Sequence, residues 1–533
     1  MAAEPTASAE PSIVEGEARG FAPHLLTADL EQAAECCPDR AAFRMAATDF
    51  SYAALHDAAG RLAGGLAALG VGPGDRIATL MPNHPLFLVA LHAAWRRGAA
   101  MSGLNPLYGQ PLLQRQLAEV TPKVLLTLDE PELLAKARAV APQGAVVLAA
   151  TPSGAELLPG ADAGVGGLAP QMTGPAPAPA PLTVDDLALL QFTGGTTGVP
   201  KAAELTHRNI SINNQQLAAR LPRFGYACED FLALPPFSHI IGSSIILCLG
   251  VKLAATLHPV ARFVPEEAVR LMVAQRISFL SGVPPMFMAI ARLPAAQGTD
   301  WSALKYCMTG GAAIPASVIA EFEGVTGAPL LTAYGLSETA PGAVLALEGE
   351  KAPEGGTGRP LPETKVEIRD IEDPARIVPR GSRGEICISG PQVTRGYFGR
   401  PEETAHALGQ GFLRTGDIGV IDAEGFIWVV DRLKDIIIAS GYNIYPALVE
   451  EALYRHPDIV EAAVVGAPDD YRGETVKAVV VLAAGKTLAL EDLQAFLKDS
   501  LSPMEMPKLL EVRSELPRSP AGKILRRALK AEG

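Results

Sequence analysis

Residues 187–201 read LALLQFTGGTTGVPK, and this stretch decides the fold. The apolar run Leu187–Phe192 predicts a buried strand. The loop after it combines three glycines with threonine hydroxyls and a lysine, and a helix capped at Thr206 is expected next. Glycines allow backbone N–H groups to converge, so the loop predicts a nest for phosphate, although a Gly/Thr loop taken alone is often only a turn. It is not a Walker loop, because proline precedes the lysine and alanine follows it. The candidate nucleotide ligands here are Thr193, Gly194, Gly195, Thr196, Thr197, Gly198 and Lys201.

Strands and helices alternate on both sides of this loop. Arg76–Met81 and Val146–Ala149 are strand-like, and Asn83–Arg97 predicts a helix that ends at Gly98. This rhythm predicts an α/β fold, with a large N-terminal domain of stacked, largely parallel sheets covered by helices. The Pro/Ala-rich residues 168–181 predict a linker or surface loop. Ile240–Leu257 is apolar but interrupted by glycines and a lysine, which favours a buried helix and strand over a membrane span.

The last hundred residues predict a small, mobile α+β domain. A helix begins at Pro446 and stops before Pro457, strands follow at Ile459–Val465 and Val476–Leu482, and a helix covers about Leu490–Leu501. The expected division is a large domain over residues 1–430, a hinge over 431–435 and a lid domain over 436–533.

Composition narrows the class of protein. The chain has 533 residues, 48% of them hydrophobic, and a formal net charge of −13. Such an acidic chain does not favour nucleic acid or anionic lipid as its main partner. The six cysteines form neither a metal-ligand spacing nor a disulfide framework, and Met1–Gly20 is not a secretory signal. We therefore expect a cytoplasmic protein without an integral membrane segment.

Further motifs follow the glycine loop along the chain. They are PPFSH at 235–239, MTGGAA at 308–313, YGLSET at 334–339, RTGD at 414–417, DRLKD at 431–435, SGYNIY at 440–445 and PAGKILRR at 520–527. In these strings and their order, the chain resembles the adenylate-forming superfamily of acyl-CoA synthetases, adenylation domains and luciferases. The resemblance covers roughly residues 25–530 and is strongest to fatty-acyl-CoA and 4-coumarate-CoA ligases.

The resemblance implies roles around ATP. Tyr334 would lie against adenine, with Gly335, Gly311 and Ala312 bordering that site. Glu338, a hard oxygen ligand, would hold Mg²⁺, and Thr339 would contact a phosphate. The two oxygens of Asp417 suit the ribose diol, and Arg432 would touch the ribose or phosphate. Lys434 would be the hinge, and the ammonium of Lys523 would bridge the substrate carboxylate and the α-phosphate as the catalytic lysine.

The resemblance also implies two further sites. Ser440, Gly441 and Tyr442 would line the coenzyme A tunnel, and His239 would admit the carboxylate or coenzyme A, unless it is an ordinary core histidine. Small residues are expected to line the acyl pocket, namely Ser238, His239, Ser243, Gly310, Ala313, Gly335, Ala340 and Pro341. The chain departs from the family pattern at Gly194, at residues 202–204 and at Ser238.

These features predict an ATP-dependent acid–CoA ligase. It would form an acyl-adenylate and then an acyl-CoA thioester, with release of pyrophosphate and AMP, from a hydrophobic or aromatic carboxylic acid. Its cofactor would be Mg²⁺, with ATP and coenzyme A as substrates, and it would be a monomer or homodimer. The alternatives are a stand-alone adenylating enzyme that loads a carrier protein in trans, a luciferase-like oxygenase, and a degenerate member that binds acyl-adenylate without making it.

Overall fold

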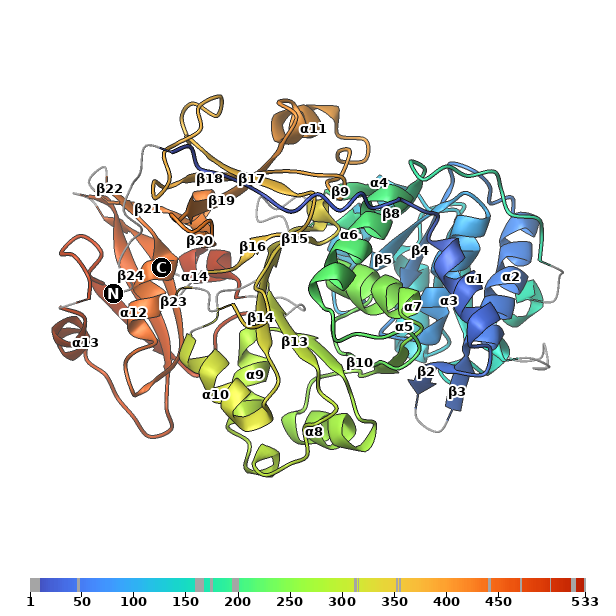
Figure 1. Cartoon of the computed structure of the whole chain (residues 1–533), viewed down its shortest axis with the longest axis horizontal. Helices are drawn as coiled ribbons and strands as arrows, with labels where there is room; N and C mark the ends of the chain where they lie inside the picture. Colours follow the sequence, from blue (N-terminus) through green and yellow to red (C-terminus); the bar gives the residue numbers. More distant parts are fainter. Residues whose placement is uncertain are drawn as a thin grey trace.

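The computed structural model describes residues 10–45, 48–158, 167–172, 176–193, 201–310, 314, 316–350, 353, 356–439, 442–469, 472–498, 500–518 and 524–531. Four β-sheets with flanking helices build this part of the chain (Figure 1). None of its helices is long and apolar enough to cross a membrane. The architecture confirms the predicted mixed α/β class, with a large N-terminal part and a smaller C-terminal one.

A six-stranded sheet carries the glycine loop at one edge. Its order is β7-β6-β4-β5-β8-β9, and all neighbours are parallel except the last pair. The predicted strands and helix of this region are confirmed, and Pro at its first position starts the helix α3. The elements are α2 (Tyr52–Ala68), β4 (Arg76–Leu80), α3 (Pro85–Arg96), β5 (Ala100–Leu104), α4 (Gln110–Val120), β6 (Val124–Leu128), α5 (Pro131–Val140), β7 (Val146–Ala150), β8 (Leu187–Phe192) and β9 (Ala202–Thr206).

A nine-stranded sheet forms the middle of the molecule. Its order is β16-β15-β14-β13-β12-β10-β11-β2-β3, parallel from β14 to β2. One continuous hydrophobic core joins it to the six-stranded sheet. The elements are α1 (Thr27–Cys36), β2 (Ala41–Met45), β3 (Thr48–Ser51), α6 (His207–Arg220), β10 (Asp230–Ala233), β11 (Thr256–Pro259), α8 (Pro265–Ala274), β12 (Phe279–Gly282), α9 (Pro284–Ala291), β13 (Tyr306–Gly310), α10 (Ala316–Thr326), β14 (Leu330–Gly335), β15 (Gly342–Leu345) and β16 (Arg359–Pro360).

The segment after residue 239 is an unusually wide helix. The predicted buried helix and strand of 240–257 are confirmed, but the helix is the π-helix η3 (Ile241–Leu249), followed by α7 (Gly250–Lys252) and β11. π-Helical turns are rare and are frequent at functional sites. The predicted linker at 168–181 contains a short 3₁₀ turn, η2 (Ala169–Met172), and residues 173–175 lie outside the described part.

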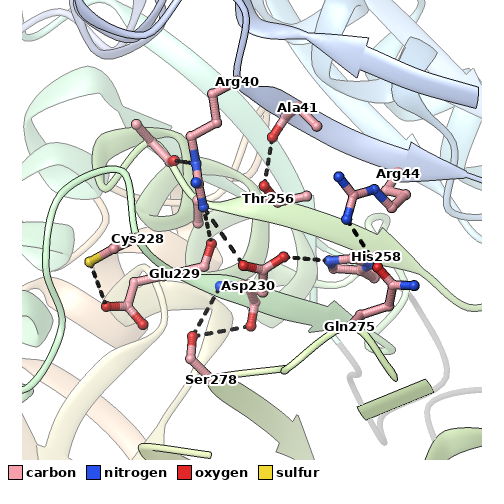
Figure 2. Close-up of polar contacts among 12 residues, drawn as sticks. Arg40, Ala41, Arg44, Cys228, Glu229, Asp230, Thr256, His258, Gln275 and Ser278 are labelled. Atoms are coloured by element: carbon pink, nitrogen blue, oxygen red, sulfur yellow. Dashed lines mark hydrogen bonds and ion pairs between the residues drawn. The ribbon is translucent and has the colours of Figure 1, made fainter. Parts of the chain in front are cut away.

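A polar network holds the amino ends of β10, β11 and β12 together (Figure 2). Asp230 Oδ1 lies 2.7 Å from Nε2 of the buried His258, and the Asp230 N–H donates to Ser278 Oγ at 3.0 Å. Arg40 donates to the carbonyls of Ala254 and Glu229 at 2.7 and 2.8 Å. This network stabilises the sheet at the amino ends of its strands. Ligand sites of open parallel sheets usually lie at the opposite, carboxyl ends of the strands.

The third sheet is antiparallel throughout, with the order β1-β17-β18-β19-β20. It contains β1 (Ile13–Glu15), β17 (Lys365–Arg369), β18 (Gly384–Ser389), β19 (Leu413–Ile421) and β20 (Ile427–Arg432), with α11 (Pro401–Leu408) beside it. The expectation of largely parallel sheets therefore does not extend to this one. Its strands β19 and β20 are joined by a short turn rather than by a crossover helix.

The C-terminal elements have a sheet and a core of their own, at one end of the molecule beside β17–β20 (Figure 1). The predicted helix at Pro446 and both predicted strands are confirmed. The helix expected to reach Leu501 ends earlier, at Leu497, and the Ser500 N–H bonds to the Leu497 carbonyl in a tighter turn of i to i−3 type. The elements are η6 (Leu433–Asp435), β21 (Ile437–Ala439), β22 (Tyr442–Ile444), α12 (Pro446–Leu453), β23 (Ile459–Asp469), β24 (Gly473–Leu482), α13 (Leu490–Leu497), β25 (Leu509–Arg513) and α14 (Arg526–Ala531).

Candidate active site

A tight turn at the carboxyl end of β14 forms the floor of the candidate site. The turn contains the 3₁₀ helix η5 (Ser337–Thr339). The buried hydroxyl of Thr339 accepts from the Leu336 N–H at 2.9 Å and donates to the Pro341 carbonyl at 2.5 Å. A Cβ atom on Gly335 would lie 1.8 Å from that same carbonyl oxygen, so only glycine fits there. The structure thus gives Thr339 a turn-shaping role, and its phosphate contact remains a prediction.

Glu338 is held in this turn with its carboxylate almost out of water. Its relative exposure is 7%, and its carboxylate Oε1 accepts from the Tyr397 hydroxyl at 2.7 Å. Its backbone carbonyl accepts from the Thr394 N–H at 2.7 Å. Burial raises the pKa of the Glu338 carboxyl, and the Tyr397 hydrogen bond opposes that rise only in part. A cation beside this carboxylate would favour its charged form.

Asp417 joins the motif at 334–339 to the motif at 414–417. Asp417 Oδ2 accepts from the Tyr334 hydroxyl at 2.8 Å, and Oδ1 lies 3.2 Å from Nε of Arg432. β19 and β20 set this geometry, because Asp417 and Arg432 are directly opposed in the ladder. Burial raises the pKa of the Tyr334 hydroxyl, and the neighbouring Asp417 charge adds to the rise.

Lys201 and Tyr397 connect the glycine loop to Glu338. The Lys201 ammonium lies 5.4 Å from the centre of the Tyr397 ring, and the Thr193 N–H donates to the Lys201 carbonyl at 2.9 Å. The loop therefore joins the antiparallel strands β8 and β9. The expected helix, α6, begins only after β9, with Thr206 as its N-cap in a capping box with Asn209. Because β9 separates the loop from α6, the N-terminus of that helix does not contribute N–H groups to a phosphate site at the loop.

Sequence reasoning missed Tyr397. Its only local signal is the Arg-Gly-aromatic string 395–397 in a loop without periodicity. Its partner Glu338 is 59 positions away, and the contact is therefore purely tertiary.

The expected acyl-pocket residues come from three elements. His239 lies two residues before the π-helix η3: its Nδ1 accepts from the Ile241 N–H at 3.3 Å, and its carbonyl accepts from the N–H of the buried Ser243 at 2.9 Å. Ser244 donates from Oγ to the Ala340 carbonyl at 2.7 Å, which ties this helix to the turn at Ala340–Pro341.

Ser238 and Gly310, two further expected pocket residues, lie beside neighbouring strands. The Ser238 carbonyl accepts from Gln191 of β8 at 3.0 Å. Gly310 ends β13 opposite Ala333 of β14.

The remaining expected site residues belong to the glycine loop, the segment after β13 and the C-terminal unit. Tyr442 lies in β22, whereas the following lie outside the described residues: Gly194, Gly195, Thr196, Thr197, Gly198, Gly311, Ala312, Ala313, Ser440, Gly441 and Lys523.

The expected hinge begins where β20 ends. The 3₁₀ helix η6 directly follows Arg432, the last residue of β20, and Lys434 is its second residue. Burial raises the pKa of the neighbouring Asp431 carboxyl to about 6, despite the nearby Arg526.

Comparison with known proteins finds matches over most of the chain. Residues 30–398 match the family model described as AMP-binding enzyme, and residues 448–523 match that of the AMP-binding enzyme C-terminal domain. The chain belongs to the AMP-binding enzyme family. The resemblance to the adenylate-forming superfamily is thereby confirmed.

Two relatives and one solved protein illustrate the family. A long-chain-fatty-acid–CoA ligase of Bacillus subtilis (strain 168) is 36% identical over 518 residues, covering 93% of this chain and 92% of the relative. A feruloyl-CoA synthase of Amycolatopsis sp is 36% identical over 493 residues, covering 92% and 96%. ATP-bound MatB from Rhodopseudomonas palustris superposes with a TM-score of 0.86 at 28% identity, covering 96% and 99%, and apo MatB with a TM-score of 0.76 over the same shares.

Proposed function

We propose that this AMP-binding enzyme is an ATP-dependent acid–CoA ligase. It activates a carboxylic acid as an acyl-adenylate, releases pyrophosphate, and transfers the acyl group to coenzyme A with release of AMP. The observation that carries the proposal is a pair of neighbouring sets of contacts between residues 201 and 432, close enough for the charges of Arg432 and Asp417 to act on the Glu338 carboxyl. Arg432, Asp417 and Tyr334 form one set, and Glu338, Tyr397 and Lys201 form the other. The fatty-acid and feruloyl ligases among its relatives support the reaction class.

The nucleotide would lie along these contacts. The two carboxylate oxygens of Asp417 now contact Tyr334 and Arg432. When ATP binds, the two ribose hydroxyls would replace these partners and donate to the same oxygens. The Tyr334 ring offers an apolar face to the adenine. Lys201 and the glycine loop supply positive charge and N–H donors at the phosphate end.

Magnesium fits the residues present. Among the described residues there is no group of three or more His, Cys, Asp or Glu side chains that could hold a metal by itself. Mg²⁺ usually takes one or two carboxylates and fills its other positions with phosphate and water oxygens, so the single buried Glu338 suits a metal that arrives with ATP. When bound, the ion would offset the negative charge of the phosphates.

The protein must let two anions approach each other. Attack of a carboxylate oxygen on the α-phosphorus forms a mixed anhydride and expels pyrophosphate. Lys523 would supply the ammonium that lowers the repulsion in this transition state. The C-terminal unit would then turn about Lys434, and the thiol of coenzyme A, entering beside Ser440, Gly441 and Tyr442, would attack the acyl carbon and release AMP.

The acid would be hydrophobic or aromatic. The buried Ser243 and Ala340 come from two elements that Ser244 ties together, and like Gly310 and Gly335 they carry no charge, which suits an apolar group better than an anionic one. The feruloyl and long-chain relatives support both kinds of substrate.

The test is acid-dependent exchange of labelled pyrophosphate into ATP with acetate, octanoate, palmitate, benzoate and 4-coumarate, followed by AMP release with coenzyme A. We expect exchange with at least one of the larger acids and turnover with coenzyme A. Preference for acetate would contradict the substrate class. Turnover with only a phosphopantetheinyl carrier protein would replace coenzyme A as the acceptor. Binding of acyl-adenylate without exchange for any acid would identify a degenerate member.

A further inference from the structure

Asp431 is a buried acid three residues before Lys434, the proposed hinge residue, and it caps a helix that follows Lys434 in the chain. Its side chain is 1% exposed. Oδ2 accepts from the N–H of Ala447, the second residue of α12, at 2.8 Å, and Oδ1 accepts from the Arg432 N–H at 2.7 Å. The N-cap residue of α12, Tyr445, makes no side-chain cap of its own. A residue of the β17–β20 sheet thus satisfies one of the free N–H groups at the start of a helix in the C-terminal unit.

Arg526 links the same carboxylate to the C-terminal motif. Its Nη1 lies 3.9 Å from Asp431 Oδ1 and 3.4 Å from Asp435 Oδ2, and its Nη2 donates to Glu450 Oε2 at 2.7 Å. One guanidinium therefore serves three carboxylates, from β20, η6 and α12. Arg526 begins α14, three residues after Lys523.

A turn about Lys434 would separate these groups unequally. Asp435, Glu450 and Arg526 all follow the hinge and would move together, whereas Asp431 would stay with β20. The bonds of Asp431 to Ala447 and Arg526 would then exist in one arrangement only. An interaction present in one of two states shifts the population toward that state. The described arrangement matches ATP-bound MatB better than apo MatB, with TM-scores of 0.86 and 0.76.

We propose that Asp431 is a latch that holds the C-terminal unit in the adenylating arrangement, and that Arg526 is a positioning residue that ties α14 to it. This rests on the proposed two-step function. The latch acts on the first half-reaction, because adenylation requires Lys523 at the α-phosphate. It opposes the second, because thioester formation requires the unit to turn away.

Full-length Asp431→Ala tests the latch by the ratio of the two half-reactions. Adenylation is measured as pyrophosphate exchange with the panel acid that exchanges fastest, and thioester formation as AMP release by coenzyme A from that acid's synthetic adenylate. We expect the ratio of adenylation to thioester formation to fall about tenfold, as loss of one charge-assisted contact implies. Arg526→Met should shift the ratio the same way, and Arg526→Lys should restore part of it.

Asp422→Asn is the matched control. Asp422 is also a buried acid of the β19–β20 hairpin, but its carboxylate accepts hydrogen bonds from Phe426 and Trp428 within that hairpin. It should lower stability without changing the ratio. Equal loss of both half-reactions in Asp431→Ala, with a fall in melting temperature, would reduce Asp431 to a structural residue and overturn the latch. An unchanged ratio in a folded variant would overturn it as well.

Hydrogen exchange separates failure of the latch from failure of the proposed function. In Asp431→Ala, peptides over 445–453 should exchange faster than in the wild type, because Ala447 loses its acceptor, whereas Asp422→Asn should leave them unchanged. If the wild type exchanges pyrophosphate with no acid, the proposed function fails, and this readout alone decides the latch. Unchanged exchange over α12 would refute it.

Discussion

The phenolic O–H of Tyr397 donates a hydrogen bond to Oε1 of Glu338 over 2.7 Å. This bond occupies one oxygen of a buried carboxylate. It thereby fixes the orientation of the carboxylate plane and the direction in which the other oxygen points. A residue of the loop before α11 thereby orients the acid that the family resemblance assigns to Mg²⁺. The Lys201 ammonium above the same ring brings the end of the glycine loop to this point.

Tyr397→Phe should weaken the use of magnesium more than the use of the acid. Without its partner, the Glu338 carboxylate can rotate away from the orientation that a metal with fixed geometry requires. We expect about a tenfold rise in the Mg²⁺ concentration that gives half-maximal pyrophosphate exchange, consistent with a hydrogen bond to a charged group. Binding of Mn²⁺ with ATP, followed by electron paramagnetic resonance, gives a readout independent of turnover.

Tyr454→Phe is the control for that change. The Tyr454 hydroxyl also donates from a partly buried ring, but to the Ala462 carbonyl within the C-terminal unit. Its metal dependence should equal that of the wild type. An equal change in both variants, or none in Tyr397→Phe, would contradict the orienting role.

Asp417→Asn should abolish recognition of the ribose rather than of the phosphates. An amide keeps one acceptor but loses the second, together with the charge that Arg432 neutralises. We expect ATP affinity to fall roughly ten- to a hundredfold, in line with loss of one or two charge-assisted hydrogen bonds. Comparison of ATP with 2′,3′-dideoxy-ATP isolates the cause, because the wild type should discriminate between them and the variant should not. Retained discrimination in the variant would place the ribose elsewhere.

The sequence predicts the elements whose signals are local. Proline at the first helical position marks α3 and α12, and short, mostly apolar runs mark β8 and β4. The antiparallel sheet escapes such reasoning. Its edge strand β1 pairs with β17 some 350 positions later, and nothing in three residues of β1 encodes that partner. The π-helix has the same apolar pattern as an α-helix, so its extra width is also invisible.

The candidate site divides in the same way. Tyr334, Glu338 and Asp417 stand in strings that can be read directly, and the structure brings them into one neighbourhood. Tyr397 and Asp431 gain their importance only from contacts that cross between strands, loops and helices. A sequence motif can therefore identify a carboxylate that binds a ligand, but it does not identify the side chain that orients this carboxylate.

Gly335→Ala should inactivate the enzyme by displacing the turn after β14. The added methyl group would meet the Pro341 carbonyl oxygen at 1.8 Å, and the Thr339 hydroxyl at 3.0 Å narrows the space further. We expect pyrophosphate exchange to fall by at least about a hundredfold, because an ångström-scale misplacement of reacting groups can cost that much.

Gly324→Ala is its counterpart, in an exposed part of α10 where a Cβ meets no atom within 4 Å. It should keep full exchange activity and gain up to about 1 kcal/mol in stability. Full activity of Gly335→Ala would show that the turn can move without consequence, against the arrangement described for Glu338 and Thr339.

His84 should make the protein sensitive to mild acid. It is buried at the N-cap of α3, where its Nδ1 accepts from the Leu86 N–H at 3.1 Å, and burial lowers its pKa to about 4. The unfolded chain binds a proton near pH 6.5, whereas the folded chain does not until about pH 4. The contribution to stability is therefore complete above pH 6.5 and is lost as the pH falls through this window, by up to about 3 kcal/mol.

His84→Asn keeps a capping acceptor without titrating, so its free energy of unfolding, from urea titrations between pH 7 and 4, should fall less steeply than that of the wild type. The exposed His406→Asn should follow the wild type, and a His84→Asn curve parallel to the wild type would show that protonation of His84 does not open the fold.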